Sequence, residues 1–274
     1  MSIVTFWNDG KRETGQTMSM AAIATRMAMK HNYKTVLINT KYNDTTLEEG
    51  FWGPNVPKAK TDIVTGISGL TKAILSNKTS PEIISNYTKA MLKGGRLELL
   101  TDKEVEIEEY EKQKSVMKSM IKMANKYYDL VFVDLEGSLE DPFITGILEQ
   151  SNLIIPTITQ RIQDINKYIS IKNKKELFQR DNTLLLIGKY DEHLMCNKKN
   201  TERYIKDQIN EKDVYVIPYS TMYFESCNQG QIIDYIYKFI KIKPGSPQAP
   251  VIEALDQIYT RIIEKLREMQ MKIY

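Results

Sequence analysis

Short, almost wholly apolar runs recur along the chain and alternate with longer segments that carry both apolar and charged side chains. Runs of this kind are typical of strands that are buried on both faces of a sheet. The predicted strands are Ile3–Phe6, Lys34–Asn39, Leu130–Asp134, Leu153–Thr157, Thr183–Gly188 and Val214–Pro218. Helical composition or spacing marks residues 18–30, 162–178, 199–209 and 231–240. The alternation predicts an α/β fold, with a doubly wound, mostly parallel sheet and helices on both faces.

The middle of the chain is less regular. Residues 48–60 contain Gly50, Gly53, Pro54 and Pro57, and this density of glycine and proline predicts a loop. The pattern then predicts helices over 63–75 and 81–92, a strand over 96–100 and a long charged helix over 104–126.

The C-terminal segment is amphipathic. After a short linker that contains proline, residues 251–273 place Leu255, Ile258, Ile262 and Leu266 at helical spacing. The polar face mixes acidic and basic residues, whereas helices that lie on membrane surfaces are more one-sidedly basic. We therefore expect residues 1–243 to form one domain, and the linker and helix of residues 244–274 to pack on that domain or on another subunit rather than on a membrane.

Composition narrows the class of protein. Of the 274 residues, 42% are hydrophobic and 27% are charged, which excludes a wholly disordered chain and a disulfide scaffold. Lys and Arg total 38 against 35 for Asp and Glu, so the net charge of +3 does not by itself argue for nucleic acid. Two cysteines and two histidines without metal-type spacing favour a reduced, cytoplasmic protein. We expect neither a secretory signal nor a membrane span.

The segment between the first predicted strand and the first predicted helix carries a recognisable motif. Residues Gly10 to Thr17 fit the phosphate-loop pattern G-x-x-x-x-G-K-[ST] at every fixed position but one. In such a loop, backbone N–H groups surround phosphate oxygens, and the N-terminus of the following helix adds positive potential. The Thr17 hydroxyl would bind Mg²⁺. The exception is Gln16, which stands at the lysine position and brings no charge to a phosphate.

A second motif lies where a buried strand ends at Asp134. An acidic residue at this place fits a Walker-B strand, whose carboxylate supports Mg²⁺ directly or through water. Gly137 follows shortly after, where a glycine lets the backbone approach a terminal phosphate. The alternative is an acid that only caps a turn, and we predict the metal-linked role. Glu136 and Glu140 are interpreted as solvated turn residues.

Three segments together resemble the deviant Walker-A ATPases of the ParA/MinD type. Lys11 stands at the position of the signature lysine in that family's loop, K-G-G-x-G-K-[ST]. The run from Tyr128 to Gly137 is similar to its switch II strand, Y-D-hhhh-D-x-x-x-G, with one residue fewer before the glycine. Residues 217–231, which include Pro218, are similar to its I-P…E-A-x-x-x-G segment. The motifs follow the family's order along residues 1 to about 240.

The loop itself departs from the family pattern. Gln16 replaces the Walker lysine, and Arg12 and Glu13 replace the two loop glycines. Arg12 could supply a substitute cation, because a guanidinium suits phosphate geometry. Glu13 argues the opposite, because a carboxylate repels phosphate.

Two further departures concern hydrolysis and base recognition. The family's D-x-D after the second strand reads Asn39-Thr40-Lys41, so an amide replaces the acid that helps to position the attacking water. Asn39 is interpreted as a turn residue, which asparagine favours. The family's adenine-contacting N-[RK] reads Gly188-Lys189. We therefore expect ATP hydrolysis to be weak or lost.

The resemblance implies a set of site residues. Two residues would have catalytic roles: Lys11 would reach across a dimer interface to phosphate, and Asp134 would support the metal. Thr17 and Asp134 would hold Mg²⁺. The residues expected around ATP are Gly10, Lys11, Arg12, Glu13, Thr14, Gly15, Gln16, Thr17, Met18, Gly137 and Pro218. The ligands implied are therefore ATP and Mg²⁺.

Two functions from different classes remain open, and a third ranks below them. The first is a divergent ParA/MinD-like switch, which binds ATP, dimerises and positions or partitions DNA, such as a bacterial plasmid, or a protein complex. The second is a non-catalytic scaffold that keeps the fold and binds protein partners without nucleotide. An active phosphotransferase ranks last, because neither His31 nor His193 is placed to serve the loop. Contact with non-specific DNA is a further alternative, carried by basic stretches such as Lys172 to Lys175.

Overall fold

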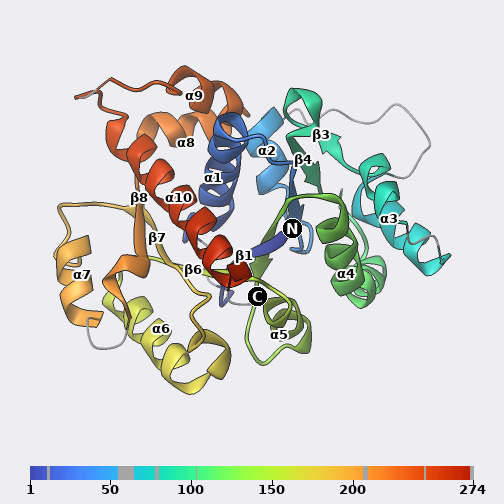
Figure 1. Ribbon diagram of the computed structural model, residues 1–274, viewed down its shortest axis with the longest axis horizontal. Coiled ribbons are helices and arrows are strands. Elements are labelled where there is room, and N and C mark those ends of the chain that lie inside the picture. Colours follow the sequence, from blue (N-terminus) through green and yellow to red (C-terminus); the bar gives the residue numbers. More distant parts are fainter. Residues whose placement is uncertain are drawn as a thin grey trace.

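A single mixed sheet runs through the computed structural model, which describes residues 1–10, 13–54, 65–77, 80–102, 104–205, 209–243 and 245–271. The strand order is β3-β4-β2-β5-β1-β6-β7-β8, and every pairing is parallel except that of β3 with β4. The strands are β1 Ser2–Asn8, β2 Thr35–Asn39, β3 Lys89–Ala90, β4 Leu97–Leu100, β5 Leu130–Glu136, β6 Leu153–Ile158, β7 Leu185–Tyr190 and β8 Val214–Pro218. The expected doubly wound, mostly parallel α/β fold is confirmed (Figure 1).

Helices cover both faces of the sheet, as Figure 1 shows. One layer contains α1 Gln16–Lys30, α2 Thr46–Trp52, α8 Thr221–Asn228, α9 Ile232–Lys238 and α10 Ala249–Met271. The other contains α3 Gly66–Leu75, α4 Ile107–Tyr127, α5 Pro142–Glu149, α6 Ile162–Lys174 and α7 Lys198–Ile205. Short 3₁₀ helices occupy Pro81–Asn86, Lys93–Gly95, Glu176–Phe178 and Glu211–Asp213.

Two hydrophobic cores result from the alternation of side chains along the buried strands. In β1, Val4 and Phe6 pack into the core beneath α1, while Ile3 and Trp7 pack into the core beneath α4. All four of these side chains are buried. A strand that is apolar at successive positions therefore has to lie between two helical layers, which is why the apolar runs predict interior strands.

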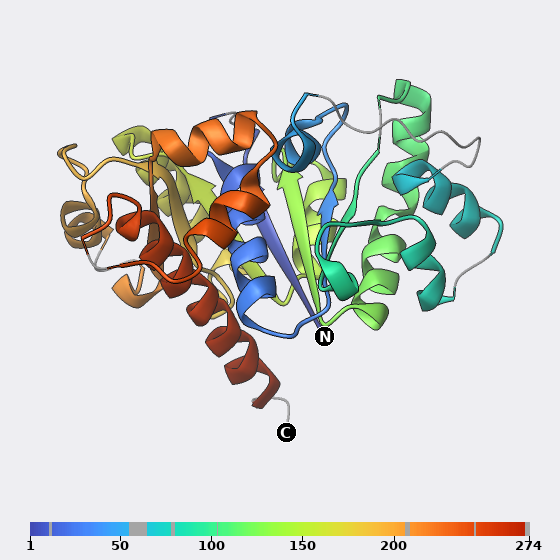
Figure 2. The same ribbon diagram turned by 90° about the horizontal axis from the view of Figure 1, so that it is seen from above.

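The C-terminal helix α10 packs against α1 and β8. Its apolar residues Leu255, Ile258 and Ile262 are fully buried in the same core as α1. Arg26 of α1 is 1% exposed and donates to both carboxylate oxygens of Asp256 on α10, at 2.7 and 2.8 Å. Figure 2 shows the end of α10 and the N-terminus at one edge of the molecule, and α2 and α8 at the opposite edge.

Several predicted elements differ from the structure. The loop predicted over residues 48–60 is wrong in its first part, because α2 continues through Gly50 to Trp52. A Cβ on Gly50 would lie 2.7 Å from Ile232, so this glycine allows α2 and α9 to approach closely rather than ending the helix. The helix predicted over 81–92 is a short 3₁₀ helix followed by β3, which pairs with the edge of β4. The short helices α5 and α8 were not predicted.

Candidate functional site

The carboxyl ends of three neighbouring strands meet at the loop that the motif predicts. In the pairing register, Asn39 of β2 lies opposite Asp134 of β5, and Asn8 of β1 lies opposite Glu136 of β5. Since β5 lies between β2 and β1, the turns that follow all three strands are adjacent. Ligands bind at this edge in doubly wound folds.

The turn between β1 and α1 is compact. Gly10, Glu13 and Gly15 have φ angles of 86°, 78° and 76°, in the left-handed region that glycine tolerates and glutamate rarely adopts. Gly15 is the residue before α1 and supplies no side-chain cap, while the N–H of Gln16, the first residue of the helix, donates to the Thr14 hydroxyl at 3.3 Å. Lys11 and Arg12 lie outside the described residues, so their predicted roles stay predictions.

The outer part of this turn is held against β7. A Cβ on Gly188 would lie 2.0 Å from the carbonyl oxygen of Thr14, so only glycine lets the two backbones touch. Lys189, which has a φ of 49°, lies with its side chain against Gly15. The Gly188-Lys189 pair therefore positions the turn, at the place where the family resemblance implies a base contact.

Gln16 is directed into the protein. Its amide nitrogen donates to Asp134 Oδ1 at 2.6 Å and to the carbonyl oxygen of Leu135 at 3.0 Å, and its amide oxygen accepts from Asn8 Nδ2 at 3.1 Å. The side chain is 2% exposed. Because the amide is fully engaged with β1 and β5, it does not point from the loop toward a phosphate.

Lys41 lies at the centre of the predicted metal site. Its ammonium nitrogen is 2.6 Å from Thr17 Oγ1 and 2.9 Å from Asp134 Oδ2. The Thr17 hydroxyl in turn donates to Asp134 Oδ2 at 2.7 Å. Carboxylates of Asp44 and Glu136 lie 3.8 and 3.9 Å from the same nitrogen. A positive charge of this chain thus neutralises Asp134, which is completely buried.

The turn after β2 fixes Lys41 in this place. Asn39 Oδ1 accepts from the backbone N–H of Lys41 at 3.0 Å, and Asn39 Nδ2 donates to the carbonyl oxygen of Asp44 at 2.6 Å. Thr40 donates through both its N–H and its hydroxyl to the carbonyl oxygen of Asp134. Tyr110 of α4 donates to the carbonyl oxygen of Thr40 at 3.0 Å, and burial raises the pKa of this tyrosine to about 12. Asn39 therefore braces a turn and does not stand free to orient a water molecule.

The remaining predicted nucleotide contacts are spread around the loop. The carbonyl oxygen of Met18 accepts from Tyr223 Oη at 2.6 Å, which ties the start of α1 to α8. Gly137 has a φ of 146°, and its N–H donates to the carbonyl oxygen of Asn8 at 3.0 Å. Pro218 ends β8, which is separated from β1 by β6 and β7. The structure thus gathers Gly137 at the loop and leaves Pro218 at the edge of the sheet.

The arrangement does not fit a divalent cation in the place that the motif predicts. Magnesium binds oxygen ligands at about 2.1 Å, so an ion bound to both Thr17 Oγ1 and Asp134 Oδ2 would overlap the Lys41 ammonium. Among the described residues, no group of three or more His, Cys, Asp or Glu side chains is arranged to hold a metal ion. The uncapped start of α1 still suits an anion.

Sequence reasoning overlooked Lys41 as a site residue. The signal was present, because Lys41 follows β2 at the third position of the family's D-x-D motif, and a strand end next to β5 must lie beside Asp134. Asn8 was overlooked as a site residue as well. It ends β1, and its side chain accepts from the N–H of Gly10 as well as donating to Gln16.

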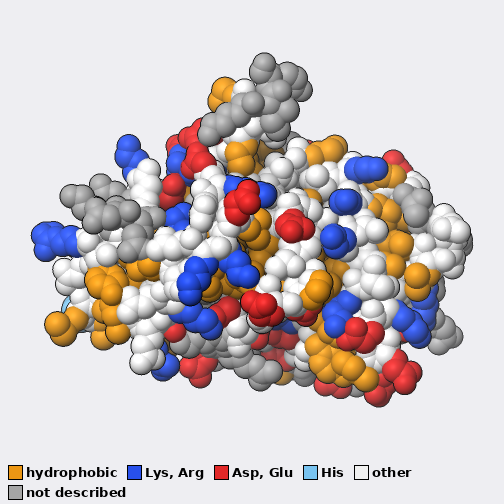
Figure 3. Space-filling view, turned by 90° about the horizontal axis from the view of Figure 1, so that it is seen from below, with side chains coloured by type: hydrophobic (Ala, Val, Ile, Leu, Met, Phe, Trp, Pro, Cys, Tyr) orange, Lys and Arg blue, Asp and Glu red, His pale blue; other side chains and the backbone are white. Residues whose placement is uncertain are grey.

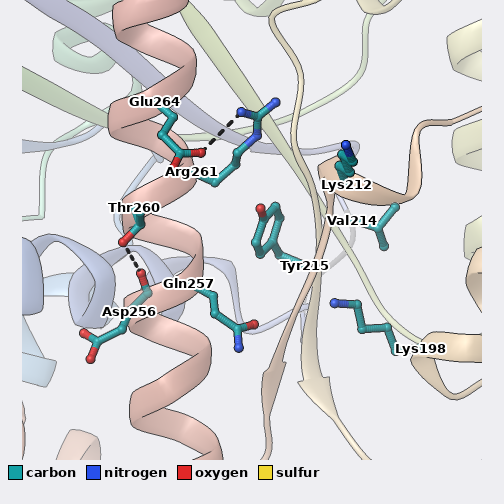
Figure 4. Close-up of a pocket in the computed structure, with 9 residues that line it drawn as sticks. All are labelled: Lys198, Lys212, Val214, Tyr215, Asp256, Gln257, Thr260, Arg261 and Glu264. Carbon is teal, nitrogen blue, oxygen red and sulfur yellow. Dashed lines mark hydrogen bonds and ion pairs between the residues drawn. The ribbon is translucent and has the colours of Figure 1, made fainter.

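A separate hollow lies away from this loop, between α10 and the edge strand β8 (Figure 4). Its volume is about 560 Å³, and basic and acidic side chains line it together. Arg261 pairs there with Glu264 at 3.4 Å and with Asp213 at 3.2 Å. Its strand residues, such as Val214, lie at the start of β8, whereas the loop lies at the carboxyl ends of the strands.

The fold matches solved structures of ParA/MinD-type ATPases over nearly the whole chain. A ParA family ATPase from Chlorobium tepidum TLS is 14% identical, with a TM-score of 0.71, over 95% of this chain and 99% of that one. The septum site-determining protein MinD from Pyrococcus horikoshii OT3, complexed with Mg-ADP, is 14% identical with a TM-score of 0.66 over 96% of each chain. A MinC:MinD cell division complex from Aquifex aeolicus gives 18% identity and a TM-score of 0.64 over 96% of each chain.

These likenesses confirm the resemblance at the level of the fold, which is that of the ParA/MinD-type P-loop ATPases. No protein-family model matches the sequence, and no curated protein matches it either. In the described part of the chain, no helix is long and apolar enough to cross a membrane.

Proposed function

We propose that this chain is a divergent ParA/MinD-like switch protein that positions or partitions DNA or a protein complex and has weak or no ATP hydrolysis. The observation that carries the proposal is the contact of Lys41 with both Thr17 and Asp134. This contact places a side-chain cation where a P-loop ATPase holds the Mg²⁺ that it needs for hydrolysis. Asn39, which stands in place of an acid, also supports weak or absent hydrolysis, because its amide is held in a turn.

Nucleotide binding and a homodimer belong to the first form of this proposal. The left-handed turn at Gly15 and the uncapped N-terminus of α1 support binding of a phosphate group. In this form ATP would favour a dimer, Lys11 would reach the partner's phosphates, and the dimer would bind a protein partner or cargo. The MinD of the Pyrococcus structure is complexed with Mg-ADP, and the MinD of the Aquifex structure is complexed with MinC.

The second form is a scaffold that binds protein partners without nucleotide. It is favoured by the direction of Gln16, whose amide is satisfied by Asn8, Asp134 and Leu135. A loop whose polar side chains already satisfy one another gains less from a phosphate ligand than a loop with free donors.

A role in binding DNA receives little support from the face of the molecule drawn in Figure 3. On the side of the molecule drawn in Figure 3, lysine and arginine side chains are intermixed with acidic ones over the described residues. Binding to DNA depends on a basic stripe or patch of one sign. The face drawn in Figure 3 therefore gives no support for DNA as the cargo in preference to a protein complex.

Calorimetry with ATP and ADP, combined with light scattering and release of inorganic phosphate, tests the proposal. We expect phosphate release at background level in both forms. ATP binding together with a doubling of the mass supports the switch, whereas no binding and an unchanged mass support the scaffold. Sustained Mg²⁺-dependent phosphate release by the native protein would contradict both.

A further inference from the structure

Lys41 has the contacts of a bound metal ion. Its ammonium touches Thr17 Oγ1 and Asp134 Oδ2, the two oxygens that hold Mg²⁺ in a P-loop ATPase. The carboxylates of Asp44 and Glu136 complete an acidic surround within 4 Å of the nitrogen. We propose that Lys41 is the resident cation of this loop, so that the site neither requires nor admits a divalent cation.

The Lys41 ammonium and the two oxygens beside it satisfy one another without a metal: the ammonium donates to Thr17 Oγ1 and lies 2.9 Å from Asp134 Oδ2. The Thr17 hydroxyl donates its one hydrogen to Asp134 and accepts from Lys41. The other carboxylate oxygen of Asp134 accepts from Gln16 at 2.6 Å. A divalent cation could enter only by displacing Lys41, and the displaced ammonium would lose these contacts.

The backbone beneath Lys41 opposes such a displacement. The flanking turn is bonded to β5 through Thr40, whose N–H and hydroxyl both reach the carbonyl oxygen of Asp134, at 3.2 and 2.7 Å. Asn39 closes the same turn on its other side. The Lys41 side chain is 10% exposed, so little of it is available to solvent or to a competing anion.

The charge at the site differs accordingly from that of a metal-dependent loop. Lys41 brings one positive charge where Mg²⁺ brings two, and this charge cannot be removed by a chelator. One consequence of the inference rests on the proposed function, because it assumes that nucleotide binds. This consequence is that a phosphate bound at α1 would bind equally well with and without Mg²⁺. The replacement of the cation itself is a property of the protein without ligand.

Thermal melting in magnesium and in EDTA tests the inference on the intact protein. We expect the melting temperature of the native chain to be the same in both buffers. Lys41→Met leaves the buried Asp134 without its counter-charge, and the melting temperature should fall by roughly 5–15 °C in EDTA. Millimolar Mg²⁺ or Mn²⁺ should then recover several degrees of this loss, because the ion can take the vacated place between Thr17 and Asp134.

The matched control is Lys167→Met. Lys167 pairs with Asp9 at the same loop but contacts neither Thr17 nor Asp134, so this variant should show no response to Mg²⁺. If Lys41→Met is too unstable to isolate, Lys41→Met combined with Asp134→Asn removes both charges and should fold, again without a magnesium response. A melting temperature of the native chain that rises with Mg²⁺, or a folded Lys41→Met that ignores it, overturns the inference.

Calorimetry with ATP in the same two buffers separates this inference from the proposed function. Equal affinity in Mg²⁺ and EDTA supports both, and binding that requires Mg²⁺ overturns the inference while leaving nucleotide binding intact. Absence of binding in both buffers contradicts the nucleotide-binding form of the proposed function, and the melting comparison then decides the inference by itself.

Discussion

Gln16 and Asp134 are joined by a hydrogen bond of 2.6 Å from the amide nitrogen to the carboxylate, across the interface between α1 and β5. The residue that stands at the Walker lysine position is thereby turned toward the sheet. Asn8 and Leu135 take up the remaining capacity of the amide. The described part of the loop has left-handed residues at Gly10 and Gly15, and Gln16 stands in place of its principal cation; this combination leads to the first prediction.

Gln16→Lys should raise the affinity for ATP roughly fivefold, because a hydrogen bond from a charged donor is about 1 kcal/mol stronger than one from a neutral amide. Calorimetry of the variant and the native protein measures the change. Gln16→Met is the control, since it frees Asp134 in the same way without adding a charge, and it should gain nothing. Equal affinities for Gln16→Lys and Gln16→Met would show that the loop does not bind phosphate.

Arg26 should make the principal polar contact between α1 and α10. Its guanidinium donates to Asp256 at 2.7 and 2.8 Å and to the carbonyl oxygens of Phe239 and Ile240 at 3.2 Å. Arg26→Met should lower the free energy of unfolding by about 3 kcal/mol, because these acceptors lose a planar donor that other side chains do not reproduce. Urea denaturation measures the change.

The control for Arg26 is Lys30→Met at the exposed end of the same helix, which should change the free energy of unfolding by less than about 0.5 kcal/mol. A loss at Arg26 as small as that at Lys30 would mean that apolar packing alone holds α10 in place.

Gly188→Ala should disturb the phosphate loop from outside it. The new Cβ would lie 2.0 Å from the carbonyl oxygen of Thr14, so either the loop or β7 must move, at a cost of about 2 kcal/mol. Gly94→Ala provides the comparison, because Gly94 has a φ of 76° with open space around it and costs only backbone strain of about 1 kcal/mol. Urea denaturation of the two variants gives the difference, and a smaller loss at Gly188 than at Gly94 would contradict the close contact.

The two cysteines should react differently with alkylating reagents. Both are free, Cys196 is partly exposed and Cys227 is buried. Burial raises the pKa of the Cys227 thiol to about 11, so at about pH 8 iodoacetamide should label Cys196 in the folded protein and reach Cys227 only after unfolding. Mass spectrometry of the labelled peptides distinguishes the sites, and equal native rates would refute the burial of Cys227.

The same shift predicts a stability change at alkaline pH. The folded protein binds the Cys227 proton more tightly than the unfolded chain, in which the pKa is 9.0. This contribution is complete below pH 9.0 and is lost as the pH rises toward about 11. Cys227→Ala should therefore lose less stability than the native chain between these values, as measured by urea denaturation at each pH.

The buried strands could be predicted because each is apolar at successive positions and lies between segments of helical composition. The helix α2 could not, because Gly50 reads as a loop residue until the packing of α2 on α9 is known. The start of α5 did carry a signal, since Asp141 caps it by accepting from the N–H of Phe143 and Pro142 follows as the first helical residue. Ser220 caps α8 in the same way, by accepting from Tyr223.

The sequence predicts which residues lie near the loop, but not how their side chains interact with one another. The sequence identifies the loop, Thr17 and Asp134 as neighbours because a strand order of this type brings them together. The interaction of Lys41 with this pair depends on the register of β2 against β5, in which Asn39 lies opposite Asp134. That register is a property of the folded sheet, and the two residues are far apart in the chain. The direction of Gln16 likewise depends on the acceptors that β5 offers.

A structure determined from crystals of the native protein that were soaked in ATP and Mn²⁺ tests most directly whether Lys41 replaces the metal. The anomalous signal of manganese locates the ion independently of the protein atoms. We predict no anomalous peak between Thr17 and Asp134, with the Lys41 ammonium in contact with both. A manganese ion bound to these two residues, with Lys41 displaced toward solvent, would contradict the account.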